Sequence, residues 1–598
     1  MLRLAFYVAA VALALIHVFV TFRGINSTEG MYQAQLARNL AQKGVWQTLA
    51  VQPYAWAQLE RNGRTPTPLA MPETTQLPVQ PLIWSLGFRA FSGQAEYAPL
   101  DGGGRIYIYD RVIAGFGVLW WLIAIYLTHG AARQLFDEKV AAIAAVALLV
   151  CQPAWDLAVS GSSRMLLIME FALAFRLFVS IAMRHAAGRS TALYLVTLGV
   201  ISALMLLTHP LALWLVLGLA IGATFFLKGN HTTTLLLVLA PVVLAAGAWG
   251  WWQARLCGEV LGGLRAVWQS QFAAMGHELV TRDFTPGFAT IVVDDLLRRM
   301  GLNTEDQSGR FYSHCGHVVV ALFFFIALLH QFRRAEASAA RWTLAVTFGS
   351  VVIGMTLIGL SGGVKDDMAL YIVIMPAMCI YGAAMLVILW SRFLGPNAGT
   401  TFWPQWGGPV IALVLCAIPM YANLPVFLKY GLAKGNSIDP HWPPYVPDRV
   451  VILNRYVRPG EYVFTDAPHF IAWYAGVPAV NLPTQREDFA TMKKLTDGRN
   501  ATVGGFVMTP FSARTEYFFD LFSGNYSEWR DLIYRGHMLA FDKNFDPEPS
   551  FPYRIIHPLL LMTVGSKEST SLPMVFYAEQ ARTPKAQPIK DTNPEGKK

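Results

Sequence analysis

The chain has 598 residues, of which 54% are hydrophobic and 14% are charged, and its formal net charge is +9. Soluble globular proteins carry about 25% charged residues, so the composition predicts a membrane protein and excludes an ordinary soluble domain. The positive charge lies mostly in short loops between apolar runs, where it fits anionic headgroups better than nucleic acid. The sequence contains no Gly-rich phosphate loop and no Cys/His metal pattern.

Apolar runs of roughly 17 to 25 residues predict transmembrane helices. The sequence holds eleven such runs, at residues 4–22, 106–127, 139–155, 163–182, 191–208, 210–227, 232–252, 316–332, 341–360, 369–391 and 408–428. We interpret the first run as a retained anchor, because it continues to Phe22 and lacks a small-residue cleavage pattern.

The short loops predict the orientation of the chain. If the N-terminus is cytoplasmic, the cytoplasmic turns carry the basic residues Arg133, Lys139, Arg184, Arg189, Lys228, Arg333, Arg334, Arg341 and Arg392. This pattern satisfies the positive-inside rule. An odd number of spans then places the C-terminus on the external side.

Two long loops and a tail are expected outside the membrane. The loops are residues 23–105 and 253–315, and the tail is residues 429–598, after a transmembrane domain of residues 1–428. A Pro-rich segment at 441–447 is typical of a linker. Beyond it, a strand at 461–466, a short helix at 468–474 and a strand at 478–482 predict a small α/β domain with parallel pairing. The polar residues from about 583 onward are expected to be disordered.

The first loop begins with a predicted helix over residues 27–44. Ser27 can cap it, Tyr32, Leu36 and Leu40 recur at helical spacing, and Gly44 can end it. Glu29 falls in its first turn. An acid there can simply interact with the helix dipole, which is worth about 0.3–1 kcal/mol.

Five cysteines are present. Cys151, Cys379 and Cys416 lie inside predicted spans, where a thiol acts as a small hydrophobe. Cys257 and Cys315 lie at the two ends of the second loop, in a compartment that permits disulfides. The sequence leaves two alternatives open, a Cys257–Cys315 bridge or two free thiols.

Several segments resemble a known family. These are residues 27–40, residues 81–93, Arg111 at the start of the second span, residues 133–136 and residues 472–483. Their order and character resemble the GT-C glycosyltransferases that use a polyprenyl-phosphate sugar, and in particular the ArnT-like and PMT-like members. The resemblance implies a bacterial inner-membrane enzyme with a periplasmic C-terminal domain. It would transfer a sugar, with inversion, from undecaprenyl phosphate to a lipid, glycan or protein acceptor.

The resemblance also implies site residues. Glu29 stands where the family has its catalytic acid, as general base or as the carboxylate of a metal-assisted site. Thr28 replaces a second acid and Gln80 replaces a lysine, so the need for a divalent metal ion stays open. The donor phosphate requires cations. The candidates are Arg111, Lys365, Arg38 and Arg23. For each of them the alternative is that the side chain snorkels to the membrane interface.

Further candidates have structural explanations beside the functional one. Tyr32 lies on the face of the predicted helix, His209 precedes Pro210, and Glu170 is an acid within a span, which indicates function by default. Asp366 and Asp367 could bind a metal or pair with Lys365. Two other functions fit the composition, a lipid flippase or secondary transporter and a GT-C-like protein without catalysis. The asymmetric first loop and the large tail disfavour a transporter, which usually shows repeat symmetry.

Overall fold

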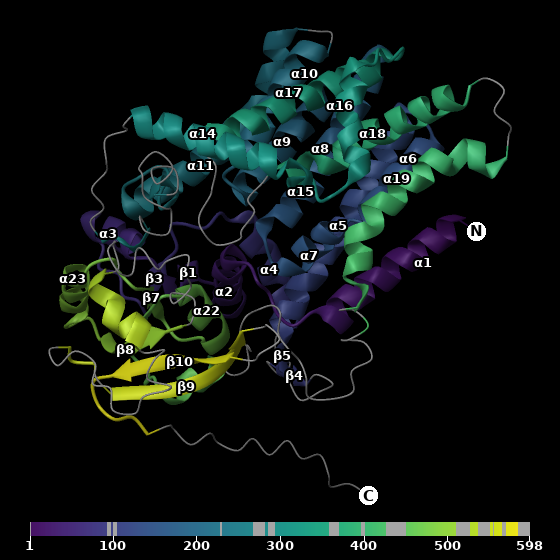
Figure 1. The fold of residues 1–598 in the computed structure, drawn as a ribbon. Helices are drawn as coiled ribbons and strands as arrows, with labels where there is room; N and C mark the ends of the chain where they lie inside the picture. Colours follow the sequence, from purple (N-terminus) through teal and green to yellow (C-terminus); the bar gives the residue numbers. More distant parts are fainter. Residues whose placement is uncertain are drawn as a thin grey trace, which may run out of the picture.

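The computed structural model describes residues 2–91, 97–99, 105–227, 230–266, 281–284, 293–357, 370–395, 401–425, 428, 450–509, 527–535, 551–553, 555–564 and 570–583. A bundle of apolar helices forms one part, and a mixed sheet forms the other (Figure 1). Helices of the first loop lie between the two. The predicted linker at 441–447 and the tail beyond 583 lie outside the described residues.

Apolar helices occupy the positions of the eleven predicted runs. They are α1 (Leu2–Leu15) with η1 (Ile16–Thr21), α5 (Ile108–Leu135), α6 (Glu138–Leu149) with α7 (Gln152–Ser160), α8 (Ser163–Ala186), α9 (Ala192–Thr208), α10 (Ala212–Phe226), α11 (His231–Cys257), α16 (Val319–Leu329), α17 (Ala335–Leu357), α18 (Tyr371–Leu394) and α19 (Phe402–Ala422). Seven of the described helices are long and apolar enough to cross a membrane, or eight if α6 and α7 form one broken span. The helices α9, α10 and α16 are shorter.

The third predicted run, 139–155, is wrong as a continuous helix. The chain bends by 58° between α6 and α7. Pro153 lies in the first turn of α7, where its missing N–H costs nothing. In a continuous helix it would lose the hydrogen bond to the carbonyl of Leu149, four residues earlier, and its ring would clash with that carbonyl. The proline therefore begins a new helix instead of continuing the old one.

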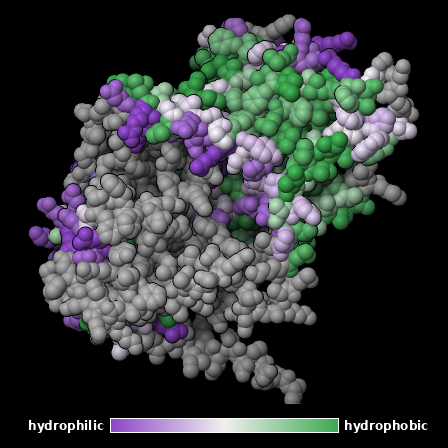
Figure 2. Space-filling view, viewed as in Figure 1, coloured by the Kyte–Doolittle hydropathy of each residue, from purple (hydrophilic) through white to green (hydrophobic). Residues whose placement is uncertain are grey.

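Small residues let the bundle helices approach closely. A Cβ on Gly382 of α18 would lie 1.8 Å from the Val320 carbonyl oxygen of α16, and one on Gly218 of α10 would lie 2.4 Å from the Cα of Thr347 in α17. Such contacts are typical of helix packing in membranes. On the side seen in Figure 2, the surface of the bundle is mostly hydrophobic between hydrophilic ends, as expected for helices that face lipid.

The C-terminal part contains a six-stranded sheet in the order β2-β7-β6-β8-β10-β9. Its strands are β2 (Ala50–Val51), β6 (Glu461–Thr465), β7 (Ala479–Asn481), β8 (Thr502–Met508), β9 (Ile555–Val564) and β10 (Thr570–Ala578). The first four in that order are parallel, and β10 pairs antiparallel with both β8 and β9. The predicted strands at 461–466 and 478–482 and their parallel pairing are confirmed. The helix between them is α22 (Pro468–Phe470) followed by the π-helix η3 (Ile471–Ala475).

The first loop folds into α2 (Thr28–Lys43), α3 (Pro53–Arg61) and α4 (Val79–Ala90), with a small pair of strands, β1 (Gln47–Thr48) and β3 (Met71–Pro72). The expected ends of α2 are confirmed. The Gly30 N–H donates to Ser27 Oγ at 3.1 Å, and Gly44 adopts a left-handed conformation with φ of 69°. The strand β2, which pairs with β7, also comes from this loop.

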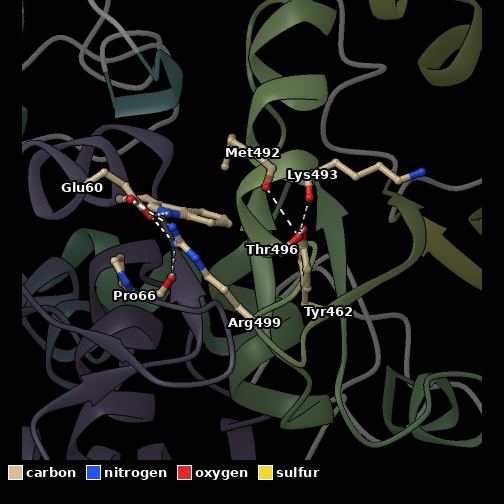
Figure 3. Close-up of polar contacts among 8 residues, drawn as sticks. Glu60, Pro66, Tyr462, Met492, Lys493, Thr496 and Arg499 are labelled. Atoms are coloured by element: carbon tan, nitrogen blue, oxygen red, sulfur yellow. Dashed lines mark hydrogen bonds and ion pairs between the residues drawn. The ribbon is translucent and has the colours of Figure 1, made fainter. Parts of the chain in front are cut away.

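A partly exposed ion pair between Glu60 and Arg499 joins the first loop to the sheet domain (Figure 3). Arg499 Nη2 donates to Glu60 Oε2 at 3.3 Å, and Arg499 Nη1 donates to Glu60 Oε1 and to the Pro66 carbonyl oxygen at 3.2 Å. Bidentate pairing of this kind is specific in geometry. Nearby, Tyr462 of β6 hydrogen-bonds Thr496 at 3.0 Å, which holds α23 (Arg486–Thr496) on the sheet.

Of the two alternatives for Cys257 and Cys315, a bridge or two free thiols, the structure has the free thiols. Cys257 and Cys315 are both free and buried. Cys257 packs with the first loop and the sheet, and its thiol donates to the Gln253 carbonyl oxygen at 3.3 Å. Cys315 instead packs in the core of the helical bundle. The two ends of the loop therefore belong to different hydrophobic clusters.

Candidate functional site

Glu29 lies in the first turn of α2, where that helix meets the start of α8. Its Oε1 accepts hydrogen bonds from Ser163 Oγ at 2.5 Å and from Gln33 Nε2 at 3.0 Å. Its Oε2 is buried and has no hydrogen-bond partner. One carboxylate oxygen is thus held in place, and the other remains able to accept a proton or a hydrogen bond from a bound group.

The backbone brings α2 against the turn between α7 and α8. The Asn26 and Ser27 N–H groups both donate to the Ser160 carbonyl oxygen, at 3.2 and 3.1 Å. A Cβ at Gly30 would lie 2.6 Å from the Gly161 carbonyl oxygen, and Gly161 itself has a φ of 84°. Glycine is required at both positions, one for close approach and the other for its left-handed conformation.

Arg164 supplies positive charge beside Glu29. It is 6% exposed, and its Nε donates to Ser162 Oγ at 3.2 Å, while Ser162 also caps α8. Burial raises the pKa of Glu29, and the Ser163 hydrogen bond and the charge of Arg164 oppose that rise. The dipole of α8 adds positive potential at the same end. The arrangement places positive potential next to a buried carboxylate.

Two further predicted residues lie around α8. Arg164 interacts electrostatically with His209 as well as with Glu29. His209 is 3% exposed, and its Nδ1 accepts from the Leu211 N–H at 3.2 Å. Glu170, 4% exposed, accepts from Thr208 Oγ1 at 2.9 Å. The structure therefore brings Glu29, His209 and Glu170 to the same helix. As in Glu29, the second carboxylate oxygen of Glu170, Oε2, is buried without a hydrogen-bond partner.

The contacts of Arg38 account for its positive charge without a bound phosphate. Its guanidinium donates to the carbonyl oxygens of Ala472 and Trp473, both at 2.7 Å, and to the Tyr107 hydroxyl at 3.0 Å. It also stacks over the Trp473 ring, 4.9 Å from the centroid. Arg38 thus joins α2 to η3.

Asp110, in the first turn of α5, completes the same contact. It is fully buried, and it accepts from Trp473 Nε1 and from the Tyr474 hydroxyl, both at 2.8 Å. We call Arg38, Asp110, Trp473 and Tyr474 the interdomain contact. Sequence reasoning missed Asp110, although an acid at the start of a span is expensive unless it is paired. The same rule applied to the start of the fourth span would have found Arg164.

The other predicted cations lie elsewhere. Arg23 donates to the carbonyl oxygens of Val20 and Phe22, at 2.8 and 2.9 Å, at the end of η1. Arg111 lies over the Phe19 ring, 5.5 Å from the centroid. Lys365, Asp366 and Asp367 lie outside the described residues.

Gln80 has a structural role. It is fully buried, and its Nε2 donates to the Gly161 carbonyl oxygen at 3.2 Å. Tyr32 packs on the sheet side of α2, with its ring 5.4 Å from that of His469. Within the described part of the chain, no group of three or more His, Cys, Asp or Glu side chains could hold a metal ion.

Two solved structures are similar to this chain over almost its whole length. ArnT from Cupriavidus metallidurans bound to undecaprenyl phosphate matches with a TM-score of 0.53 and 13% identity, covering 96% of this chain and 97% of that one. The same protein in the apo state matches with a TM-score of 0.51 and 14% identity, covering 96% and 98%. No protein-family model and no curated protein matches the sequence. The likeness shows that this is a polytopic membrane protein with the GT-C fold and a C-terminal α/β domain.

The interdomain contact predicts non-additive effects on stability. Asp110→Asn should lower the apparent melting temperature in nanodiscs, because the amide leaves a buried donor unsatisfied at a cost of about 1–3 kcal/mol. Tyr474→Phe should lower it less. The double variant should resemble Asp110→Asn alone, because both changes disrupt one contact. Strictly additive shifts would contradict the coupling.

Proposed function

We propose that this protein is a membrane glycosyltransferase that moves a sugar from a polyprenyl phosphate to a hydroxyl-bearing lipid, glycan or protein acceptor. The observation that carries the proposal is Glu29, a carboxylate with one oxygen fixed and one buried oxygen unpartnered, beside Arg164. The fold supports it, since a similar structure, ArnT, holds undecaprenyl phosphate.

The proposed reaction is a single displacement with inversion. The acceptor hydroxyl oxygen attacks the anomeric carbon and forms the new glycosidic bond, while the bond from that carbon to the phosphate oxygen breaks. The acceptor proton passes to Glu29 Oε2 as general base. The polyprenyl phosphate leaves with the bonding electron pair, so its negative charge increases in the transition state.

Arg164 and the start of α8 are proposed to stabilise that charge. A planar guanidinium can bind two phosphate oxygens, and a buried cation acts more strongly than one in water. Arg111, at the start of α5, is the second candidate cation. Arg38 is better explained by the interdomain contact.

The site is proposed to lie on the periplasmic side of a bacterial inner membrane, with the N-terminus in the cytoplasm. The basic short loops support this orientation. We expect an enzyme reporter that is active only in the periplasm to be active when fused after Thr583, because the sheet domain and the first loop form one unit. The same reporter fused after Arg133, in a predicted cytoplasmic turn, should be inactive. The reverse pattern would invert the proposed topology.

Glu29→Gln should reduce the transfer rate by about a hundredfold or more, because the nearly isosteric amide cannot accept the proton. The assay follows radiolabel from a polyprenyl-phosphate sugar to a second molecule in membranes. Glu305→Gln, an exposed change in α14 (Val293–Gly309), is the matched control and should leave transfer unchanged. Near-normal transfer by a well-folded Glu29→Gln protein would remove the base assignment.

The pH dependence gives an independent check. Only ionised Glu29 can act as a base, so kcat/KM should fall as the pH is lowered. Because burial raises the pKa of Glu29, the midpoint of this acid limb should lie above the ordinary glutamate pKa of about 4.3. Ser163→Ala removes a hydrogen bond that stabilises the charged form, so it should move this acid limb to still higher pH. Ser85→Ala is the control, since its hydroxyl donates to the Leu82 carbonyl oxygen instead. If the acid limb of Ser163→Ala lies at the same pH as that of the unmodified protein, Glu29 is not the group whose ionisation causes it.

A further inference from the structure

A polar edge of the C-terminal sheet faces the helical bundle. Val463 of β6, Ala479 of β7 and Val507 of β8 belong to the bundle core. Because side chains alternate along strands, the residues two positions further on, Thr465, Asn481 and Thr509, lie on the same face. These positions are at the carboxyl ends of three parallel strands, which is where open α/β sheets bind their ligands.

Asn481 has an unfilled hydrogen-bonding capacity there. The residue is only 5% exposed, and its Oδ1 is buried without a hydrogen-bond partner. Leaving a buried acceptor unsatisfied costs about 1–3 kcal/mol. A ligand group with an N–H or O–H would satisfy this oxygen.

The polar groups around Asn481 are held in place by hydrogen bonds. Asp466 accepts from the Thr509 N–H at 3.0 Å and from Thr509 Oγ1 at 2.7 Å, which joins the ends of β6 and β8. From the second loop, Arg282 donates to the Asp466 carbonyl oxygen at 3.4 Å, and Asp283 accepts from Thr484, which follows β7. The edge therefore presents both donors and acceptors in fixed positions.

This edge adjoins the site of Glu29 through α2. The helix α22, which carries His469, packs against both α2 and β7. The His469 ring contacts that of Tyr32, which lies one helical turn after Glu29. A group bound at the sheet edge would thus be close to the segment that holds the proposed base.

The chemistry selects among ligands. The unpartnered oxygen of Asn481 needs a donor, which a fully ionised phosphate cannot supply. The carboxylates of Asp466 and Asp283 and the guanidinium of Arg282 give this edge charges of both signs. The described residues also contain no cluster suited to a metal ion. Sugar hydroxyls donate and accept at once, so they match an edge that holds both kinds of group. We propose that this edge binds a sugar residue of the acceptor, an inference that rests on the proposed glycosyl transfer.

Saturation-transfer NMR can test this with the full-length protein in nanodiscs free of sugar-based detergent. The probes are methyl α-glucoside, methyl α-galactoside and methyl α-mannoside, without any donor lipid. At least one should bind the unmodified protein, and Asn481→Leu should weaken that binding about three- to tenfold, as expected for one lost hydrogen bond. Thr502→Val, an exposed change at the opposite end of β8, is the matched control and should bind normally.

Two further variants keep the test decisive. If Asn481→Leu fails to fold, Asn481→Asp retains an acceptor oxygen and should bind within about threefold of the unmodified protein. Glu29→Gln should bind the glycosides normally, so a failure of the base assignment would leave this result standing. No binding of any glycoside, equal binding by folded Asn481→Leu, or binding of a Ser-Thr dipeptide amide in their place would overturn the proposal.

Discussion

The placement of Glu29 depends on the interdomain contact. Arg38 lies on the same helix as Glu29, and it donates to two carbonyl oxygens of η3. Asp110 holds the Trp473 and Tyr474 side chains of η3 against the start of α5. A buried carboxylate or guanidinium is costly unless its hydrogen bonds are complete. Because these are complete only when all three segments meet, the bundle, α2 and the sheet domain have one favourable arrangement.

Other contacts also hold the helix α2 in place. Near Glu29 it meets the α7–α8 turn through glycine and backbone hydrogen bonds. Further along, Gln35 donates to Thr48 at 2.6 Å and accepts from the Leu49 N–H at 2.9 Å, which directs the chain into β2. A carboxylate held this way loses little entropy when a substrate binds, and that is the general basis of preorganised catalysis.

Local patterns in the sequence predicted the local structure well. Ser27 and Gly44 marked the ends of α2 because capping depends on neighbouring residues only, and the strands at 461–466 and 478–482 were visible from their composition. The strand β2 was not, since two residues carry no periodic signal and pair only because β7 is present. The sequence could not decide between a Cys257–Cys315 bridge and two free thiols, because separation in sequence says nothing of which core each thiol joins. Arg164 and Asp110 were overlooked because their partners come from distant segments.

The pairing of β2 with β7 also orders the events of biosynthesis. The hydrogen bond between Arg38 and Trp473 joins residues 435 positions apart, and β2 and β7 are separated almost as widely. The first loop emerges early from the ribosome, yet its edge strand has no partner until the sheet domain has been made. The proposed catalytic helix can therefore take its final position only after the last membrane helix is in place, so the chain acquires its site as a late step of assembly.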